Sequence, residues 1–378
     1  MEPFVYDALP GRVVFGVGTF SQVAAEVERL GGHRILLIAD RSGSRWADEL
    51  ATQLGARLVG RIDDVRPHVP AERASDACEL ARRRGIDVVV TIGGGSATGL
   101  GKAVALNVPL RILAVPTTYA GSEMTPIWGL TAGSRKTTGR DARVQPRTVV
   151  YDPVLTLSLP PEISGPSGMN AIAHCAEALY AEGANPITSL MAEKGIRVLS
   201  RGLPRIVEAP ADLEARSDVL AGAYLAGASF AAAGGSVHHK ICHVLGGAYD
   251  LPHAEMHTIV LPHALAFVAP AVPEAMARMA AAFGEEDVPG AVFDLAVRIG
   301  APRDLRSIGM PANRLEEATH LIVEATAGGP LPMTAAAVRS LLDGAFKGRH
   351  PERTMSVDPQ GATTPSPHEI GSVPAIPA

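Results

Sequence analysis

The sequence predicts an α/β domain built on a parallel sheet, followed by an all-helical domain. Two observations support this prediction. Short β-branched runs alternate with amphipathic stretches over residues 1–158, whereas alanine- and leucine-rich helical segments fill residues 159–350. Strands that alternate with helices and are apolar at almost every position are typical of a parallel sheet covered on both faces. Residues 351–378 are rich in Pro, Ser and Thr and lack periodicity, so we expect a disordered tail there.

Six apolar runs are the expected strands of this sheet. They lie at residues 12–16, 34–40, 56–62, 87–93, 111–117 and 148–152. Stretches between them, such as SQVAAEVERLG and AERASDACELARRRG, place apolar residues three and four apart, as helices that cover a sheet do. The pattern predicts a Rossmann-like, dinucleotide-binding domain over residues 1–158.

Composition restricts the class of protein. The net charge is -5 and no basic run occurs, so nucleic acid is not an expected partner. Cys78, Cys175 and Cys242 are too few, and odd in number, for a disulfide framework, which favours a reducing compartment. No signal pattern and no long apolar window occurs, so we expect a cytoplasmic chain without a membrane partner.

The motif TIGGGSATGLGK (91–102) follows one expected strand and opens a helix. Glycines at Gly93, Gly94 and Gly95 let the backbone approach a pyrophosphate, and amides from Ser96 onward supply donors. We expect these four residues to contact a dinucleotide. The motif differs from G-x-G-x-x-G, and a tight turn without a ligand is the alternative interpretation.

Two further segments at strand ends are expected to contact the cofactor. VPTTYAGSE (115–123) places the hydroxyls of Thr117, Thr118 and Ser122 where ligands of open parallel sheets bind. Asp40 ends another strand, where it could bind the adenosine ribose and repel a 2′-phosphate, so NADH is expected and NADPH remains possible. A capped turn and an N-cap or loop aspartate are the alternatives.

Histidines concentrate in one short span. The members are His238, His239, His243, His253 and His257. His239 and His243 share a helix face, and His253 and His257 do so if Pro252 starts a helix. Asn170 and His174 have the same spacing upstream. The clustering predicts one shared polar site.

These motifs together resemble the iron-containing alcohol dehydrogenase superfamily over about residues 4–350, which implies the dehydroquinate synthase-like fold. The resemblance rests on GGGS followed by Lys102, PTT…GSE, the Asn170–His174 helix and HxxxHxLGG…LPH. GGGS-TGLGK, PTTYAGSE, KTTGRD, SGMNAIAH, HHKICH and LPHAEMH further resemble its maleylacetate reductase branch. Segment 325–338 departs from that branch, which leaves the exact substrate open.

The resemblance also bears on metal binding. In the superfamily an Asp and three His hold a divalent metal, and these positions correspond to Asn170, His174, His239 and His253. Asn170 offers only a neutral amide, so we expect no metal. Because three histidines can bind zinc, the substitution weakens metal binding without excluding it.

The resemblance implies NAD(P)H-dependent reduction of the conjugated double bond of maleylacetate to 3-oxoadipate, in aromatic-compound degradation, by a homodimer. Hydride transfer to such a bond forms an enolate, which hydrogen-bond donors stabilise, and a histidine can then supply the proton. We expect His243 and His253 to fill these roles in either order, with the LGG turn between them folding their segments together.

Other residues are expected around this pair. Asn170, His174, His239 and Tyr119 would contact the substrate, whereas His238 and His257 would be structural. A dicarboxylate needs positive partners, and Lys136, Arg140 and Lys240 lie in the relevant segments. The resemblance assigns Lys136 to the cofactor, so Arg140 is the first choice for a substrate carboxylate. Each of these charges could instead be a solvated surface group.

Several other functions remain alternatives. A metal-dependent alcohol or glycerol dehydrogenase would share the fold, and so would a reductase of another unsaturated or carbonyl acid in biosynthesis. A dehydroquinate-synthase-like lyase would need the acidic ligand that Asn170 replaces. A homologue without catalysis, used as a binding module, is the last alternative.

Overall fold

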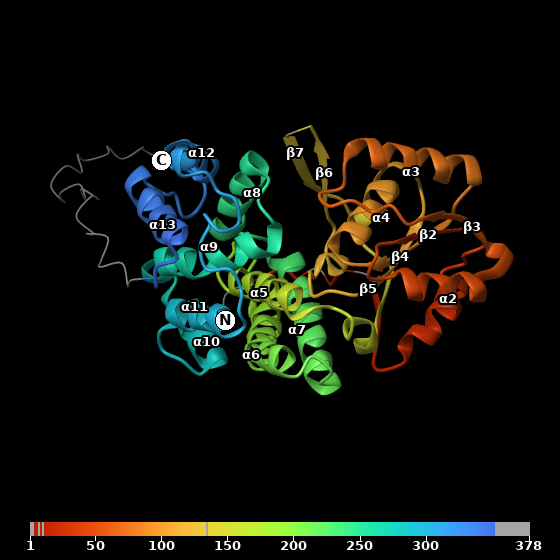
Figure 1. The fold of residues 1–378 in the computed structure, drawn as a ribbon, viewed down its shortest axis with the longest axis horizontal. Coiled ribbons are helices and arrows are strands. Elements are labelled where there is room, and N and C mark those ends of the chain that lie inside the picture. Colours follow the sequence, from red (N-terminus) through yellow and green to blue (C-terminus); the bar gives the residue numbers. More distant parts are fainter. Residues whose placement is uncertain (1–3, 7, 10, 134, 352–378) are drawn as a thin grey trace, which may run out of the picture.

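The computed structural model describes residues 4–6, 8, 9, 11–133 and 135–351. A sheet domain and a helical domain lie side by side along the longest axis of the molecule (Figure 1). The helical domain begins with α5 at Pro161, close to the expected boundary at 158. Apart from Pro351, the expected disordered tail lies outside the described residues.

All six predicted strands are confirmed. They are β1 (Arg12–Phe15), β2 (Ile35–Ala39), β3 (Leu58–Ile62), β4 (Val88–Gly93), β5 (Arg111–Pro116) and β8 (Thr148–Tyr151). They form one sheet in the order β1-β8-β5-β4-β2-β3, and every pair is parallel. The carboxyl ends of β2, β4 and β5 are therefore neighbours at one edge, where ligands of such sheets bind.

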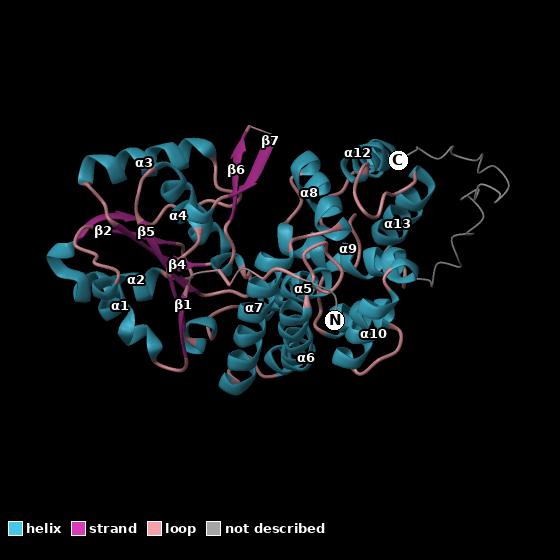
Figure 2. Cartoon of the chain, turned by 180° about the vertical axis from the view of Figure 1, so that it is seen from behind, coloured by secondary structure: helices cyan, strands magenta, loops and turns pink. Residues whose placement is uncertain are grey.

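Helices cover both faces of this sheet (Figure 2). Helices α1 (Val23–Arg29) and α2 (Ser44–Leu54) bury the face that carries Leu37. Helices α3 (Ala71–Arg84) and α4 (Gly95–Asn107) bury the face that carries Leu36. Successive strand residues point to opposite faces, so a strand buried on both sides must be apolar throughout. This requirement explains the continuous apolar runs in the sequence.

A hairpin that the sequence did not predict stands at the junction of the two domains. Its strands are β6 (Ile127–Ala132) and β7 (Arg135–Arg140), which pair antiparallel. β7 carries mostly polar residues, so the hairpin lacks the continuous apolar signal of the main sheet. Gly139 gives room for the Trp128 ring, because a Cβ there would lie 2.6 Å from a ring carbon.

The helical domain confirms the second part of the predicted fold. Its helices are α5 (Pro161–Ala178), α6 (Pro186–Glu208), α7 (Leu213–Ala233), α8 (Val237–Tyr249), α9 (His253–Val268), α10 (Pro273–Phe283), α11 (Val288–Arg298), α12 (Leu315–Thr326) and α13 (Ala335–Lys347). Helix α5 is buried at every position from Ser164 to Ala178 and packs against α6, α7 and α9. This central helix carries Asn170 and His174.

No described helix is by itself long and apolar enough to span a membrane. Helices α7 and α8 reach the required length and apolarity only as a pair, and the chain bends by 100° between them.

Candidate active site

The loops that follow β2, β4 and β5 meet at the carboxyl edge of the sheet. The amide of Gly94 donates to Oδ2 of Asp40 at 2.7 Å. The amide of Thr117 donates to the carbonyl of Gly93 at 3.0 Å. The predicted glycine loop, Asp40 and the threonine loop are thus brought together, as sequence reasoning expected.

The glycine loop is shaped by its neighbours. Gly93 has φ +150°, and a Cβ there would lie 2.3 Å from the Asp40 carboxylate, so only glycine fits. Gly94 is the N-cap of α4, while Gly95 and Ser96 lie half-buried in its first turn. First-turn amides have no partner within their own helix and lie at its positive end, which suits an anionic ligand.

Asp40 acts as a brace between two loops. Its Oδ1 accepts from the amides of Ser42 at 2.9 Å and Gly43 at 3.1 Å, while Oδ2 accepts from Gly94. These bonds agree with the alternative interpretation of Asp40 as a loop aspartate that binds backbone amides. Asp40 is half-buried, and its contact with a cofactor ribose stays a prediction.

A buried lysine fixes the threonine loop. The Lys102 ammonium donates to the carbonyls of Ser122 at 2.6 Å, Thr125 at 2.8 Å and Ile127 at 2.8 Å. Burial lowers the pKa of Lys102 to about 7, and the nearby Glu123 carboxylate opposes that effect. Sequence reasoning noted Lys102 only as part of a motif and missed this role. The sequence signal for this role was the position of Lys102 in the helix that follows the glycines.

The threonine loop itself is only partly accessible. Thr117 is almost fully buried, and its Oγ1 lies 2.7 Å from Oγ of Ser42. Thr118 and Ser122 are half-buried. Thr118 and Ser122 therefore remain available for the predicted cofactor contacts, whereas Thr117 braces the loop after β2.

Helices α5, α8 and α9 bring the predicted histidines into one cluster. The His174 and His239 rings are stacked with centroids 5.0 Å apart. The His239 and His257 centroids lie 4.8 Å apart, and those of His253 and His257 lie 4.2 Å apart. The Phe230 ring from α7 contacts His174 and His239 at 4.6 and 4.5 Å. The shared polar site is therefore assembled from four helices.

Glu177 is a member of the cluster that sequence reasoning missed. Its Oε2 lies 2.5 Å from Nδ1 of His239, and both side chains are buried. Burial raises the pKa of Glu177, but the charge and hydrogen bond of His239 outweigh that effect, and the pKa falls to about 2. The carboxylate fixes the ring so that Nε2 of His239 faces away from it. The signal was its position three residues after His174 on α5.

His238 and His257 form the inner layer of the cluster. Both are fully buried, and Nε2 of His238 shares a hydrogen bond of 3.0 Å with Nδ1 of His257. Burial lowers the pKa of His238 to about 3 and the pKa of His257 well below its usual value. Their placement agrees with a structural role.

His243 and His253 lie at the exposed side of the cluster, in the middle of α8 and at the start of α9. The expectation that the LGG segment forms the turn between them is wrong. Gly246 and Gly247 belong to α8, and the chain reverses at Asp250, which has φ +51°. Pro252 is the N-cap of α9, so the predicted start of this helix is confirmed.

Two expected substrate contacts are placed elsewhere. Tyr119 is fully buried and its hydroxyl accepts from Arg216 at 3.1 Å, so the structure gives no support to its predicted contact with the substrate. Arg140 donates to the carbonyl of Ala231 at 2.6 Å, which ties β7 to the end of α7. Because this hydrogen bond occupies the guanidinium, Arg140 is a weaker candidate for binding a substrate carboxylate. The Lys136 side chain lies outside the described residues.

The residues at the superfamily's metal positions offer a divalent ion no anionic ligand. Oδ1 of Asn170, Nδ1 of His174 and Nε2 of His239 are buried without partners, but none is anionic. Among the described residues, ligand atoms converge within 4.8 Å only for His238, His239 and His257, a different set that lacks a carboxylate. A site without an anionic ligand binds hard divalent ions weakly.

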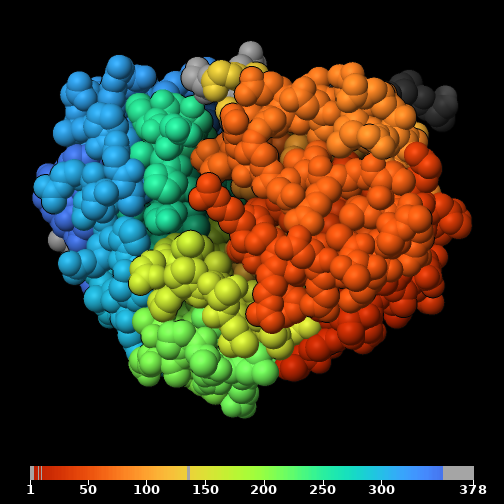
Figure 3. All heavy atoms as spheres, turned by 45° about the vertical axis from the view of Figure 1, so that its right-hand side comes forward, coloured from red at the N-terminus to blue at the C-terminus, as the bar shows by residue number. Residues whose placement is uncertain are grey.

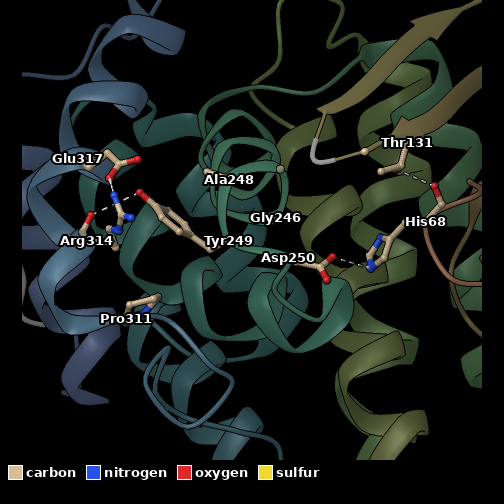
Figure 4. A pocket seen from close by; sticks show the side chains of 11 residues that line it. His68, Thr131, Gly246, Ala248, Tyr249, Asp250, Pro311, Arg314 and Glu317 are labelled. Carbon is tan, nitrogen blue, oxygen red and sulfur yellow. Dashed lines mark hydrogen bonds and ion pairs between the residues drawn. The ribbon is translucent and has the colours of Figure 1, made fainter.

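A cavity of about 690 Å³ lies between the domains beside the histidine helices (Figure 4). The sheet domain contributes His68 and Thr131, and the end of α8 contributes residues 246–250. Nε2 of His68 lies 3.8 Å from Oδ1 of Asp250, across the domain junction. Figure 3 shows the surface of the two domains meeting along this side of the molecule. The cavity gives a small molecule room next to α8.

The fold and the site together define an oxidoreductase of the dehydrogenase type, with a glycine loop at the carboxyl edge of the sheet and a histidine cluster in the helical domain. Residues 10–153 match the family model described as "Iron-containing alcohol dehydrogenase". Residues 165–346 match "Fe-containing alcohol dehydrogenase family, C-terminal". The chain belongs to the iron-containing alcohol dehydrogenase family.

Individual relatives are more specific. The chain is 49% identical to a maleylacetate reductase of Burkholderia cepacia, over 93% of this chain and all of the relative. A crystal structure of maleylacetate reductase from Rhizobium sp. strain MTP-10005 matches with TM-score 0.88 and 44% identity, over 93% of this chain and all of that one. A putative alcohol dehydrogenase from Ralstonia eutropha JMP134 matches with TM-score 0.90 and 51% identity, at the same coverages.

Proposed function

We propose that this chain is a maleylacetate reductase, which transfers hydride from NADH to the conjugated double bond of maleylacetate and forms 3-oxoadipate. Relatives of that name are 43 to 49% identical over more than nine-tenths of the chain. The observation that carries the proposal is the chemistry of the family's metal positions, where the amide of Asn170 stands in place of the acidic ligand, beside ring nitrogens of His174 and His239 that have no partner.

The proposed reaction suits such a site. Hydride adds to the double-bond carbon remote from the ketone, and the electron pair of the double bond moves onto the ketone oxygen. The resulting enolate carries one negative charge, which donors from imidazole and amide groups stabilise. His243 or His253 then donates a proton to the other carbon, the ketone re-forms, and NAD⁺ leaves. The nicotinamide supplies the hydride, and the protein supplies orientation, donors and the proton.

We infer the remaining properties from the same resemblance and site. Asp40 beside the glycine loop favours NADH over NADPH, because a 2′-phosphate near a carboxylate is repelled. No metal is required. The enzyme acts in the cytoplasm as a homodimer, late in the degradation of aromatic compounds.

The test is NADH oxidation with freshly generated maleylacetate, with product identified as 3-oxoadipate. We expect turnover that persists after dialysis against EDTA, and less than one metal ion per chain by elemental analysis. Activity that is abolished by the chelator and restored by iron or zinc would instead indicate a metal-dependent dehydrogenase. Turnover of simple alcohols at a higher kcat/KM than maleylacetate would point the same way.

A further inference from the structure

Helix α8 carries a lysine on the same side as one candidate catalytic histidine. Lys240 lies three residues before His243 and seven before Gly247, and at 3.6 residues per turn the three lie along one side of the helix. Gly247 lines the cavity between the domains. Gly247 at the cavity wall, His243 and Lys240 therefore follow one another along the same side of α8.

The Lys240 ammonium has no counterion within the part of the chain that the structure describes. Its side chain is half-buried, and none of the ion pairs among the described residues includes it. Other cations near the site have partners: Arg140 bonds the carbonyl of Ala231, and Arg314 pairs with Glu317. A half-buried charge without a counterion is costly, and a ligand carboxylate would relieve that cost.

The connection between α12 and α13 leaves space for this ammonium. A Cβ added at Gly329 would lie 2.8 Å from Nζ of Lys240 and 3.3 Å from the carbonyl of Thr326. The preceding Gly328 has φ +74°, so the turn itself depends on glycine. Any side chain at position 329 would have to displace the lysine.

We propose that Lys240 binds one carboxylate of the dicarboxylate substrate, and that the Gly328–Gly329 turn sets the position of its ammonium. The inference rests on the proposed function and adds a residue that selects acid substrates. His243, one turn further along α8, then acts near the reacting double bond while Lys240 holds the acid end. An alcohol without a carboxylate would gain nothing from this lysine.

The experiment compares Lys240→Met and Lys240→Arg with Lys194→Met, an exposed lysine of α6 that serves as the control. We expect Lys240→Met to raise the KM for maleylacetate by about 10- to 100-fold, the usual effect of losing a charged hydrogen bond. The kcat should change by less than about 3-fold, because the ammonium does not act in the chemical step. NADH affinity, followed by its fluorescence, should not change. Lys240→Arg should recover part of the loss.

Gly329→Ala separates a substrate role from a structural one. We expect it to raise the KM less than Lys240→Met, through displacement of the ammonium. In the double variant the two effects should not add, because Gly329 acts only through Lys240. Should Lys240→Met fail to fold, Lys240→Arg and Gly329→Ala still decide the question.

A second measurement does not depend on turnover. Maleate, a dead-end dicarboxylate, is titrated into the enzyme–NADH complex by calorimetry. We expect binding to the unmutated chain and to Lys194→Met, and at least 10-fold weaker binding to Lys240→Met. If the unmutated chain binds maleate in a Lys240-dependent way but does not reduce maleylacetate, the proposed function is wrong and the inference stands. Unchanged KM and unchanged maleate affinity in Lys240→Met would overturn the inference alone.

Discussion

His243 and His253 differ from the other histidines of the cluster in their exposure. His174, His238, His239 and His257 are buried, whereas these two are exposed, one in the middle of α8 and the other at the start of α9. A group that delivers a proton to a substrate must be reachable by it, so exposure and clustering together select this pair. The buried members hold the pair in place and bring hydrogen-bonding atoms next to it.

Replacement of His243 or His253 by Ala tests this assignment. We expect kcat to fall by about 10²- to 10⁴-fold for the residue that delivers the proton, the usual contribution of general acid catalysis. NADH affinity and the thermal midpoint should change little, because both side chains are exposed. His257→Ala is the comparison, and it should lower the thermal midpoint, since it removes a buried hydrogen bond with His238. The assignment fails if all three variants lose activity only in proportion to lost folded protein.

At the scale of elements, the segment from the threonine loop to β6 depends on one side chain of α4. Three carbonyls of this segment accept from Lys102, together with the hydroxyls of Ser122 and Thr125. The same segment leads from the cofactor edge of the sheet into the hairpin at the domain junction. A single buried ammonium therefore couples the cofactor loop to the cavity wall.

Lys102→Met should destabilise this segment. The substitution removes the ammonium that donates to the carbonyls of Ser122, Thr125 and Ile127, although the Ser122 carbonyl still accepts from the Thr125 amide. Each carbonyl left without a donor costs about 1–3 kcal/mol. We expect the free energy of unfolding in urea to fall by at least about 2 kcal/mol, with a rise in the Kd of NADH. Lys347→Met, a partly exposed lysine at the end of α13, is the control and should change neither quantity. An unchanged unfolding free energy in Lys102→Met would show that Lys102 does not hold the loop.

At the scale of the whole molecule, buried neutral histidines link stability to pH. Burial lowers the pKa of His238 to about 3 and of His263 to about 4, and it lowers those of His174 and His257 well below their usual value. In the unfolded chain these groups titrate near pH 6.5. Below that pH the unfolded state binds more protons than the folded state, so stability is full above about pH 6.5 and is lost as the pH falls toward 4 and 3.

We therefore expect the thermal midpoint to fall steeply as the pH falls below about 6.5. Each buried histidine contributes a slope of at most about 1.4 kcal/mol per pH unit. Calorimetry across this range measures the effect, and His263→Gln should reduce the slope. His320→Gln, at an exposed position on α12, should leave it unchanged. A midpoint that is flat down to pH 5 would contradict the burial of neutral imidazoles.

The sequence by itself determined the sheet, the helical domain and the spacing of the functional groups. Apolar continuity marks strands buried on both faces, and four-residue spacing places Asn170 with His174, and His239 with His243, on single helix faces. These are local patterns, which the chain carries in consecutive residues. The sequence did not predict the hairpin β6–β7, because β7 is mostly polar and its pairing with β6 leaves no run of apolar residues.

Only the tertiary structure decided which partner each side chain meets. Tyr119 lies in the motif of the cofactor loop, yet its hydroxyl meets Arg216, which is 97 residues away. Asp40 braces the glycine loop 54 residues further along the chain, and Glu177 holds His239 across 62 residues. Such contacts depend on how separate helices and strands pack, and packing direction is not encoded in the spacing of neighbours. The sequence therefore specifies which groups are present, and packing assigns a side chain to the site or to the core.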